Sequence, residues 1–400
     1  MTRDTSSVHV PHFMTGDEWQ VPTFALLRQD GSLHDGAEAP ELTHDKALRI
    51  YRAMRFTRVL DERMLAAQRQ GRLSFYLQST GEEATVVGAT AALQDDDMIM
   101  AQYREQGALA YRGFSIDEFM NQLFGNALDY GKGRQMPIHY GSAEYHYMTI
   151  SSPLATQIPQ AVGYAYGQKL DGEGRCTITF FGEGAASEGD FHAALNMASV
   201  HQVPVIFLCR NNGYAISTPV VEQFAADGIA PRAFGYRMHV IRVDGNDLLA
   251  VYQATLAARR LAVEENKPVL IEAMTYRLAA HSSSDDPSGY RSQKEEAAWR
   301  EKDPLARMRH WLERQGWWDD DEERRLEEQL RDEMLAAMKR AERQPPPPLA
   351  SLVSDVYDEV PAALAEQLAV LEAHVRRYPE EYPRGAAGLD AGAETAAGGQ

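Results

Sequence analysis

The sequence contains only two cysteines, Cys176 and Cys209, among its 400 residues. Both lie in apolar runs typical of buried strands, so we interpret them as core residues rather than as a disulfide or a metal site. No stretch reaches the ~20 apolar residues that a membrane-spanning helix needs. Positive charge is also scarce, because 40 Lys and Arg face 58 Asp and Glu, for a net charge of −18. This excess of acid argues against a nucleic-acid or anionic-membrane surface.

The N-terminal segment, MTRDTSSVHVPHF, lacks the apolar core of a signal peptide and the Arg-rich amphipathic pattern of a transit peptide. We therefore expect a cytoplasmic protein. Residues 1–42 have no sustained periodicity and are punctuated by prolines and Asp-Gly pairs. They predict an irregular arm, with a small hairpin at Phe24–Leu33, that lies on another surface of the same chain or of a partner.

Apolar runs alternate with helix-period segments over residues 43–300, and this alternation predicts an α/β fold with a doubly wound parallel sheet flanked by helices. The predicted strands are Met98–Ala101, Cys176–Phe181, Val203–Cys209, His239–Val243 and Pro268–Thr275. Residues 301–384 form a charged, helical C-terminal extension in this interpretation. The Gly- and Ala-rich tail, 385–400, is expected to be disordered.

The most informative stretch is Cys176–Tyr214, which has the pattern strand, turn, helix, strand. The turn is Gly182-Glu183-Gly184, and the second strand runs into Arg210-Asn211-Asn212. Ligands of parallel sheets bind at the carboxyl ends of the strands, where both of these polar groups lie.

Two familiar phosphate sites do not fit this stretch. The glycine spacing is not G-x-G-x-x-G, and the second strand does not end in the acid that would hold a ribose. No Gly-Lys-Ser/Thr follows the turn, which excludes a P-loop. Glu183 and Asn212 instead offer hard oxygen ligands beside a helix N-terminus, which suits Mg²⁺ bridging to phosphate, and Arg210 adds positive charge.

Other segments carry weaker signals. Tyr103-Arg104 follows a predicted strand, and Gly131-Lys132-Gly133-Arg134 is a basic loop of the kind found near an anion. The same strand–helix–strand site also fits a protein of another class, a nucleotide-binding regulatory or scaffold protein.

A GDG-type turn followed some 30 residues later by NN is the thiamine-diphosphate motif, and further segments extend the match. They are QYREQG, GKGRQMPIHYG, TISSPLATQIPQAVG, FFGEGAASEGDFHAALN, RNNGYAIST, EAMTYRLAAHSSSDD and SDVYDEVP. Over about Gly71 to Val360 the chain resembles alpha subunits of the decarboxylating component of branched-chain 2-oxo acid dehydrogenase complexes. Glu183 replaces the Asp of the broad thiamine motif, and the branched-chain enzymes share this replacement.

The resemblance implies a thiamine-diphosphate-binding fold and a role for each matching residue. Glu183, Asn212 and the Tyr214 carbonyl would hold Mg²⁺. Ser151, Pro153, Thr156 and Gln157 match a monovalent-cation site, which would take K⁺. The cofactor-binding residues would be Gln102, Tyr103, Arg104, Ser152, Leu154, Gly182, Gly184, Ala185, Arg210 and His281.

The resemblance also places Arg277 and His281 on a loop at the mouth of the active site. His281 would position substrate or the lipoyl group and transfer a proton. Ser282, the third catalytic candidate, matches a phosphorylated position of mitochondrial relatives. Since no transit peptide is recognisable, we do not predict that regulation.

In the resembling family, the glutamate that activates the cofactor belongs to a separate beta subunit. The chain would therefore be inactive alone and would form an α2β2 heterotetramer that passes the acyl group to a lipoyl-bearing acyltransferase component. The expected reaction is oxidative decarboxylation of branched-chain 2-oxo acids such as 3-methyl-2-oxobutanoate. The corresponding subunit of pyruvate or acetoin dehydrogenase is the alternative.

Overall fold

The computed structural model describes residues 9–11, 13, 15–16 and 19–382, so the predicted tail lies outside the described residues. The chain folds around a six-stranded sheet whose neighbouring strands are all parallel, in the order β1-β7-β8-β4-β3-β2. The strands are β1 (Thr23–Phe24), β2 (Met98–Met100), β3 (Thr177–Gly182), β4 (Val205–Asn211), β7 (His239–Asp244) and β8 (Val269–Met274). A small antiparallel pair, β5 (Tyr214–Ala215) and β6 (Thr218–Pro219), follows β4. The predicted parallel α/β architecture is confirmed.

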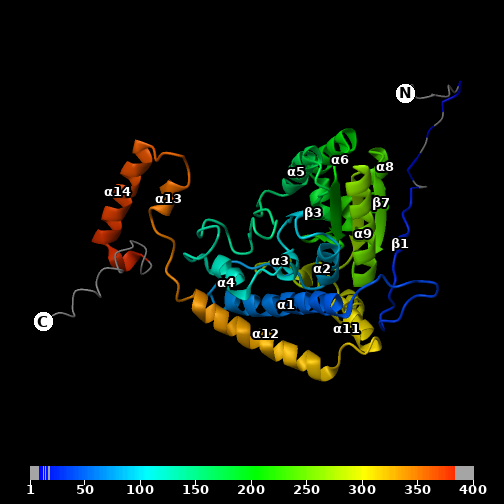
Figure 1. Ribbon diagram of the computed structural model, residues 1–400, viewed down its shortest axis with the longest axis horizontal. Helices are drawn as coiled ribbons and strands as arrows, with labels where there is room; N and C mark the ends of the chain where they lie inside the picture. Colours follow the sequence, from blue (N-terminus) through cyan, green and yellow to red (C-terminus); the bar gives the residue numbers. More distant parts are fainter. Residues whose placement is uncertain (1–8, 12, 14, 17–18, 383–400) are drawn as a thin grey trace.

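Helices cover both faces of the sheet, as Figure 1 shows with α5 and α6 at the top and α1 and α12 at the bottom. The α-helices are α1 (His44–Arg69), α2 (Glu83–Ala91), α3 (Gln106–Arg112), α4 (Ile116–Phe124), α5 (Gln157–Asp171), α6 (Gly189–His201), α7 (Val220–Gln223), α8 (Arg232–Gly235), α9 (Leu248–Glu265), α10 (Gln293–Arg300), α11 (Pro304–Arg314), α12 (Asp320–Ala341), α13 (Ser351–Ser354) and α14 (Ala362–Arg377). Short 3-10 turns are η1 (Glu183–Ser187), η2 (Pro287–Gly289) and η3 (Pro379–Glu381). One hydrophobic core packs α1, α2, α9 and α12 on one side, and a second core packs α5 and α6 on the other.

Helix boundaries follow the capping residues of the sequence. The Thr43 side chain accepts the Lys46 N–H and starts α1, and Gly71 follows its end with a φ of +74°. Asp247 starts α9 by accepting the Ala250 N–H at 3.1 Å. Each of these residues satisfies backbone groups that a helix end leaves unpaired.

The N-terminal arm lies on the body of the same chain. Thr23–Phe24 pairs in parallel with β7 and becomes an edge strand, which the sequence did not indicate. The N–H groups of Leu26 and Leu27 both reach Asp247 Oδ2 at 2.6 Å, so one carboxylate anchors the arm and caps α9. The predicted hairpin at Phe24–Leu33 is reduced to a single bridge between Leu27 and Leu33.

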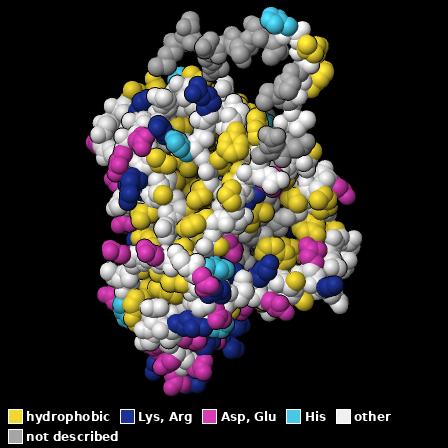
Figure 2. All heavy atoms as spheres, turned by 90° about the vertical axis from the view of Figure 1, so that its right-hand side faces the viewer, with side chains coloured by type: hydrophobic (Ala, Val, Ile, Leu, Met, Phe, Trp, Pro, Cys, Tyr) yellow, Lys and Arg dark blue, Asp and Glu magenta, His cyan; other side chains and the backbone are white. Residues whose placement is uncertain are grey.

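Figure 2 shows the face at the right of Figure 1, with hydrophobic side chains gathered over its middle and charged ones crowding its lower end. At the opposite side, α13 and α14 lie apart from the sheet (Figure 1). None of the described helices has the length and apolar character to cross a membrane.

The basic loop Gly131–Arg134 forms ion pairs within the chain. Lys132 Nζ and Arg134 Nη2 both pair with Asp355, which follows α13. The anion that this loop contacts in the structure is therefore the Asp355 carboxylate of the same chain.

Candidate functional site

A cavity of about 300 Å³ opens at the carboxyl ends of β3 and β4. The loop after β2 and the segment after β8 complete its walls. Its lining residues are Gln102, Tyr103, Arg104, Leu154, Gly182, Glu183, Gly184, Ala185, Arg210, Asn212, Tyr214, Ala215, Ile216, Arg277 and His281. The structure thus gathers most of the site residues expected from the sequence, and only Ser152, Ser282 and the cation-site residues lie outside this lining.

Glu183 and Asn212 meet at the inner end of the cavity. Strands β3 and β4 are paired in register up to Gly182 and Arg210, so the residues that follow lie side by side. The Asn212 backbone N–H donates to Glu183 Oε2 at 3.2 Å, and Gln223 Nε2 donates to Oε1 at 3.4 Å. Burial raises the pKa of Glu183, which is 1% exposed. A nearby cation would favour the ionised form of this carboxylate.

The donor set at this point fits a hard divalent cation. Glu183 offers a carboxylate, Asn212 an amide oxygen and Tyr214 a backbone carbonyl, all oxygen ligands of the kind that Mg²⁺ takes. The Tyr214 carbonyl also accepts Arg277 Nη1 at 3.3 Å. The described residues contain no cluster of three or more His, Cys, Asp or Glu side chains that could hold a metal. A metal here would therefore depend on oxygens of a bound phosphate as well as on these three groups.

Gly184 lets the backbone pass close to its neighbour. A Cβ added there would lie 2.7 Å from Ala215 Cβ, which is closer than real Cβ atoms approach. Gln102 reaches the same turn from β2, since its Oε1 accepts the Gly182 N–H at 2.7 Å. The turn after β3 is therefore held from two sides.

The loop after β2 is organised by Glu105. Its Oε2 accepts the backbone N–H groups of Gln102, Tyr103 and Arg104 at 3.0, 2.9 and 2.8 Å. Because these amides point at Glu105, the loop can serve an anionic ligand only through its side chains.

Three arginines line the cavity, and they differ in their direct partners. Arg210 pairs with Glu82 and with Glu105, whose Oε1 lies 2.8 Å from Arg210 Nε. Neither Arg104 nor Arg277 forms an ion pair with any described carboxylate. Arg210 is thus paired directly with two carboxylates, whereas the direct contacts of Arg104 and Arg277 are carbonyl, imidazole and hydroxyl groups.

His281 lies against Arg104 at the cavity wall. Burial, followed by the charges of Arg104 and Arg277, lowers the pKa of His281 to about 4. The ring is therefore neutral near pH 7. Ser282 lies next to it but turns to its own loop, where its Oγ accepts the Ser284 N–H at 3.3 Å.

The segment before α5 contributes Leu154 to the cavity. Ser152 Oγ lies 2.7 Å from His139 Nε2, and thus outside the lining. Thr156 Oγ1 lies 3.0 Å from both Ser151 Oγ and the Pro153 carbonyl. These three potential cation ligands are therefore close together.

The fourth residue of that expected cation site, Gln157, is turned toward the sheet. Its Nε2 donates to the Phe180 carbonyl in β3 at 3.0 Å. Its role as a ligand stays a prediction.

The sequence analysis missed two residues that line the cavity, Ala215 and Ile216. It also missed two carboxylates behind the cavity, Glu82 and Glu105. Ile216 has a φ of +56°, which is rare for a β-branched residue and marks a constrained position. No local pattern could identify the carboxylates, because their partner Arg210 lies more than a hundred residues away along the chain.

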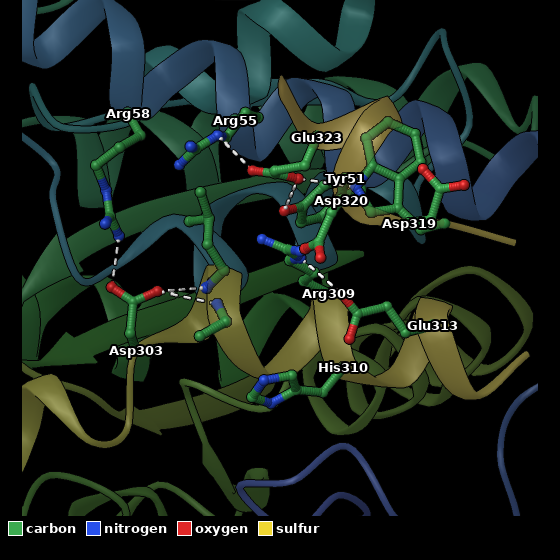
Figure 3. A pocket seen from close by; sticks show the side chains of 13 residues that line it. Tyr51, Arg55, Arg58, Asp303, Arg309, His310, Glu313, Asp319, Asp320 and Glu323 are labelled. Carbon is green, nitrogen blue, oxygen red and sulfur yellow. Dashed lines mark hydrogen bonds and ion pairs between the residues drawn. The ribbon is translucent and has the colours of Figure 1, made fainter. Parts of the chain in front are cut away.

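A larger hollow, of about 650 Å³, lies between α1, α11 and α12. Its charged side chains pair with one another (Figure 3). Arg58 bridges Glu83 and Asp303, and the buried Glu323 accepts Tyr51 Oη at 2.7 Å and Trp318 Nε1 at 2.8 Å. Since these charges are satisfied internally, we interpret this hollow as a structural ion-pair network.

The fold and the cavity define a class of protein. Proteins of this class carry an oxygen-rich anion site at the carboxyl edge of a parallel sheet. Residues 51–350 match the family described as "Dehydrogenase E1 component", and the chain belongs to that family.

The names of several relatives are more specific than the description of the family. The chain is 51% identical over 364 residues to the mitochondrial 2-oxoisovalerate dehydrogenase subunit alpha of Bos taurus, covering 91% of this chain and 80% of the relative. The human protein of that name is also 51% identical, over 91% of this chain and 82% of the relative. Subunit alpha 1 of Arabidopsis thaliana is 49% identical over 92% and 78%. The resemblance is confirmed, and the names favour the branched-chain reading over the pyruvate alternative.

The same names correct one expectation. These relatives are mitochondrial proteins, which contradicts the predicted cytoplasmic location. That prediction relied on the composition of the N-terminal segment alone. The argument against phosphorylation at Ser282 used the same premise and loses its basis.

Proposed function

We propose that this chain is the alpha subunit of a branched-chain 2-oxo acid dehydrogenase that uses thiamine diphosphate and Mg²⁺. The observation that carries the proposal is the pairing of Glu183 with Asn212 at the carboxyl edge of the sheet, inside a cavity that is also lined by Arg104, Arg210 and Arg277. The cofactor, when bound, supplies the chemistry that removes CO₂ from a 2-oxo acid. The residues of this chain bind and orient it.

In this proposal Glu183, Asn212 and the Tyr214 carbonyl hold Mg²⁺, while Arg104 and Arg277 face the diphosphate charge. Gly182 and Gly184 allow the backbone to approach the diphosphate. Tyr103 and Arg210 line the same region, and Leu154 lies where the ring system would enter.

His281 acts in its neutral form at the mouth of the cavity. A neutral imidazole can accept a proton at one nitrogen and donate one from the other. Its backbone N–H is held by Asp285 Oδ2 at 2.7 Å, which fixes the loop around it. We assign it the positioning of substrate or lipoyl group and the transfer of a proton.

The proposal of a beta-subunit partner rests on the lack of a second acidic side chain among the described residues that line the cavity. Among the described lining residues Glu183 is the only acid, and the metal uses it. Leu154 and Ile216 at the cavity mouth are 42% and 54% exposed, so an apolar wall is left uncovered. A second chain that supplies a carboxylate and covers this wall would complete the site in an α2β2 assembly. That assembly would pass its acyl group to a lipoyl-bearing acyltransferase.

The division of the chain remains part of the proposal. Residues 43–300 form the cofactor-binding unit, with the arm 1–42 before it and the helical extension 301–384 after it. The grouping of Ser151, Pro153 and Thr156 supports a K⁺ site beside the cavity.

Calorimetry and steady-state kinetics on the co-expressed alpha–beta assembly test the proposal. We expect thiamine diphosphate to bind only when Mg²⁺ is present, and 3-methyl-2-oxobutanoate to be a better substrate than pyruvate. Binding without a metal requirement would reject the metal site. A preference for pyruvate would reject the branched-chain assignment, and full activity of the isolated chain would reject the shared site.

A further inference from the structure

Glu82, at the start of α2, lies behind the cavity rather than in it. It is completely buried, and each of its carboxylate oxygens binds a residue that lines the cavity. Oε1 accepts Asn212 Nδ2 at 2.8 Å, and Oε2 pairs with Arg210 Nη1. We propose that Glu82 is a positioning residue that fixes the orientation of the Asn212 amide for metal binding. This inference depends on the proposed function, which makes Asn212 a metal ligand.

An asparagine amide is chemically two-sided. Its oxygen can bind a cation, whereas its NH₂ group only donates and would repel one. An ionised carboxylate can only accept, so Glu82 binds the NH₂ side of Asn212 and leaves Oδ1 for the other side. Oδ1 accepts the Tyr214 N–H at 3.3 Å, and the carbonyl of the same residue is expected to share the metal. The oxygen is therefore presented where the metal ligands converge.

The second oxygen of Glu82 connects this amide to the rest of the site. Arg210 lies between Glu82 and Glu105, and the Glu105 carboxylate also holds the loop at Gln102–Arg104. One buried network thus joins the metal ligand on the strand β4 side to the loop that follows β2. Buried polar partners of metal ligands commonly restrict ligand orientation in this way.

The adjacent residue, Glu83, offers a matched control. It is also buried and also pairs with an arginine, since Arg58 Nε lies 2.6 Å from its Oε1. Arg58 lines the separate hollow of Figure 3 and not the cavity. Glu82→Gln and Glu83→Gln therefore remove the same charge at neighbouring positions, but only the first touches Asn212.

The experiment uses the co-expressed alpha–beta assembly, with Mn²⁺ as a spectroscopic substitute for Mg²⁺ and saturating thiamine diphosphate. Bound Mn²⁺ is measured by electron paramagnetic resonance, independently of turnover. Glu82→Gln introduces an NH₂ group that can turn the Asn212 amide around, so we expect the Mn²⁺ dissociation constant to rise about 10- to 100-fold. Glu83→Gln should stay close to wild type.

A reciprocal exchange makes the test specific to orientation. In Glu82→Gln/Asn212→Asp the donor and acceptor change places, so the hydrogen bond is kept and an oxygen still faces the metal. We expect this double variant to bind Mn²⁺ more tightly than either single variant, because Asn212→Asp alone places two carboxylates against each other.

Each outcome decides the matter. Equal Mn²⁺ affinity of Glu82→Gln and wild type, or a double variant weaker than both single variants, would overturn the inference and leave the proposed function intact. Absence of metal-dependent thiamine diphosphate binding in the wild type would instead overturn the proposed function and this inference with it. Should Glu82→Gln fail to assemble, the comparison of the double variant with Asn212→Asp still decides, since rescue supports the role of Glu82 and its absence rejects it.

Discussion

Arg104 and His281 lie in direct contact although 177 positions separate them in the sequence. Arg104 Nη2 donates to the His281 carbonyl at 2.6 Å and lies 3.3 Å from the ring Nδ1. A fixed positive charge at this distance opposes protonation of the imidazole. This contact, together with burial, explains why the ring is neutral at physiological pH.

The first prediction concerns the titration of His281. We expect Arg104→Met to raise the pKa of His281 from about 4 toward its ordinary value of 6.5, because one opposing charge is removed. Nuclear magnetic resonance of ¹³C-labelled histidine in the assembly measures this pKa, and His281→Asn assigns the signal. An unchanged pKa in Arg104→Met would show that burial alone sets it.

The same lowered pKa has a consequence for stability. Between pH 6.5 and 4 the unfolded chain protonates this histidine while the folded chain does not. The contribution of His281 to folding is therefore complete above pH 6.5 and is lost as the pH falls toward 4.

A second prediction separates two adjacent asparagines. Asn212→Ala should abolish Mg²⁺-dependent retention of thiamine diphosphate and leave the fold intact, since it removes a proposed ligand. Asn211→Ala is the control, because Asn211 Nδ2 binds Glu272 at 2.8 Å rather than the cavity residues. Cofactor retained after gel filtration measures the effect. Undiminished retention in Asn212→Ala would show that the metal site is misassigned.

The third prediction uses the close contact at Gly184. Gly184→Ala forces a methyl group to within 2.7 Å of Ala215 Cβ, and we expect a loss of about 1–3 kcal/mol in unfolding free energy. Cofactor binding should weaken as well, because the turn after β3 would shift. Gly189→Ala, whose Cβ would meet nothing within 4 Å, should be neutral. Denaturant unfolding with and without thiamine diphosphate compares the two variants.

The fourth prediction tests the interpretation of the hollow in Figure 3. Glu323→Gln removes the buried charge that Tyr51, Trp318 and Arg55 share, so we expect it to cost roughly 1–3 kcal/mol of stability. Glu328→Gln on the exposed side of α12 is the control and should cost little. A functional rather than structural role for the hollow would instead appear as lost activity with unchanged unfolding.

Local patterns predicted much of the fold. The strands predicted at Cys176–Phe181 and Val203–Cys209 lie at Thr177–Gly182 and Val205–Asn211 in the structure. They were recognisable because apolar periodicity acts over a few residues. The edge strand Thr23–Phe24 was not predictable, since two residues carry no periodicity and the segments on either side are held by the distant residues Asp227, Arg242 and Asp247.

The sequence alone determined that Glu183 and Asn212 follow neighbouring strands, because the strand–helix–strand pattern and parallel pairing leave the carboxyl ends together. Only the tertiary structure decided how the charges are distributed around them. Arg210 forms ion pairs with Glu82 and Glu105, while Arg104 and Arg277 donate to backbone carbonyls. Which charges are neutralised depends on contacts at a few ångströms between distant segments, and no local pattern encodes them.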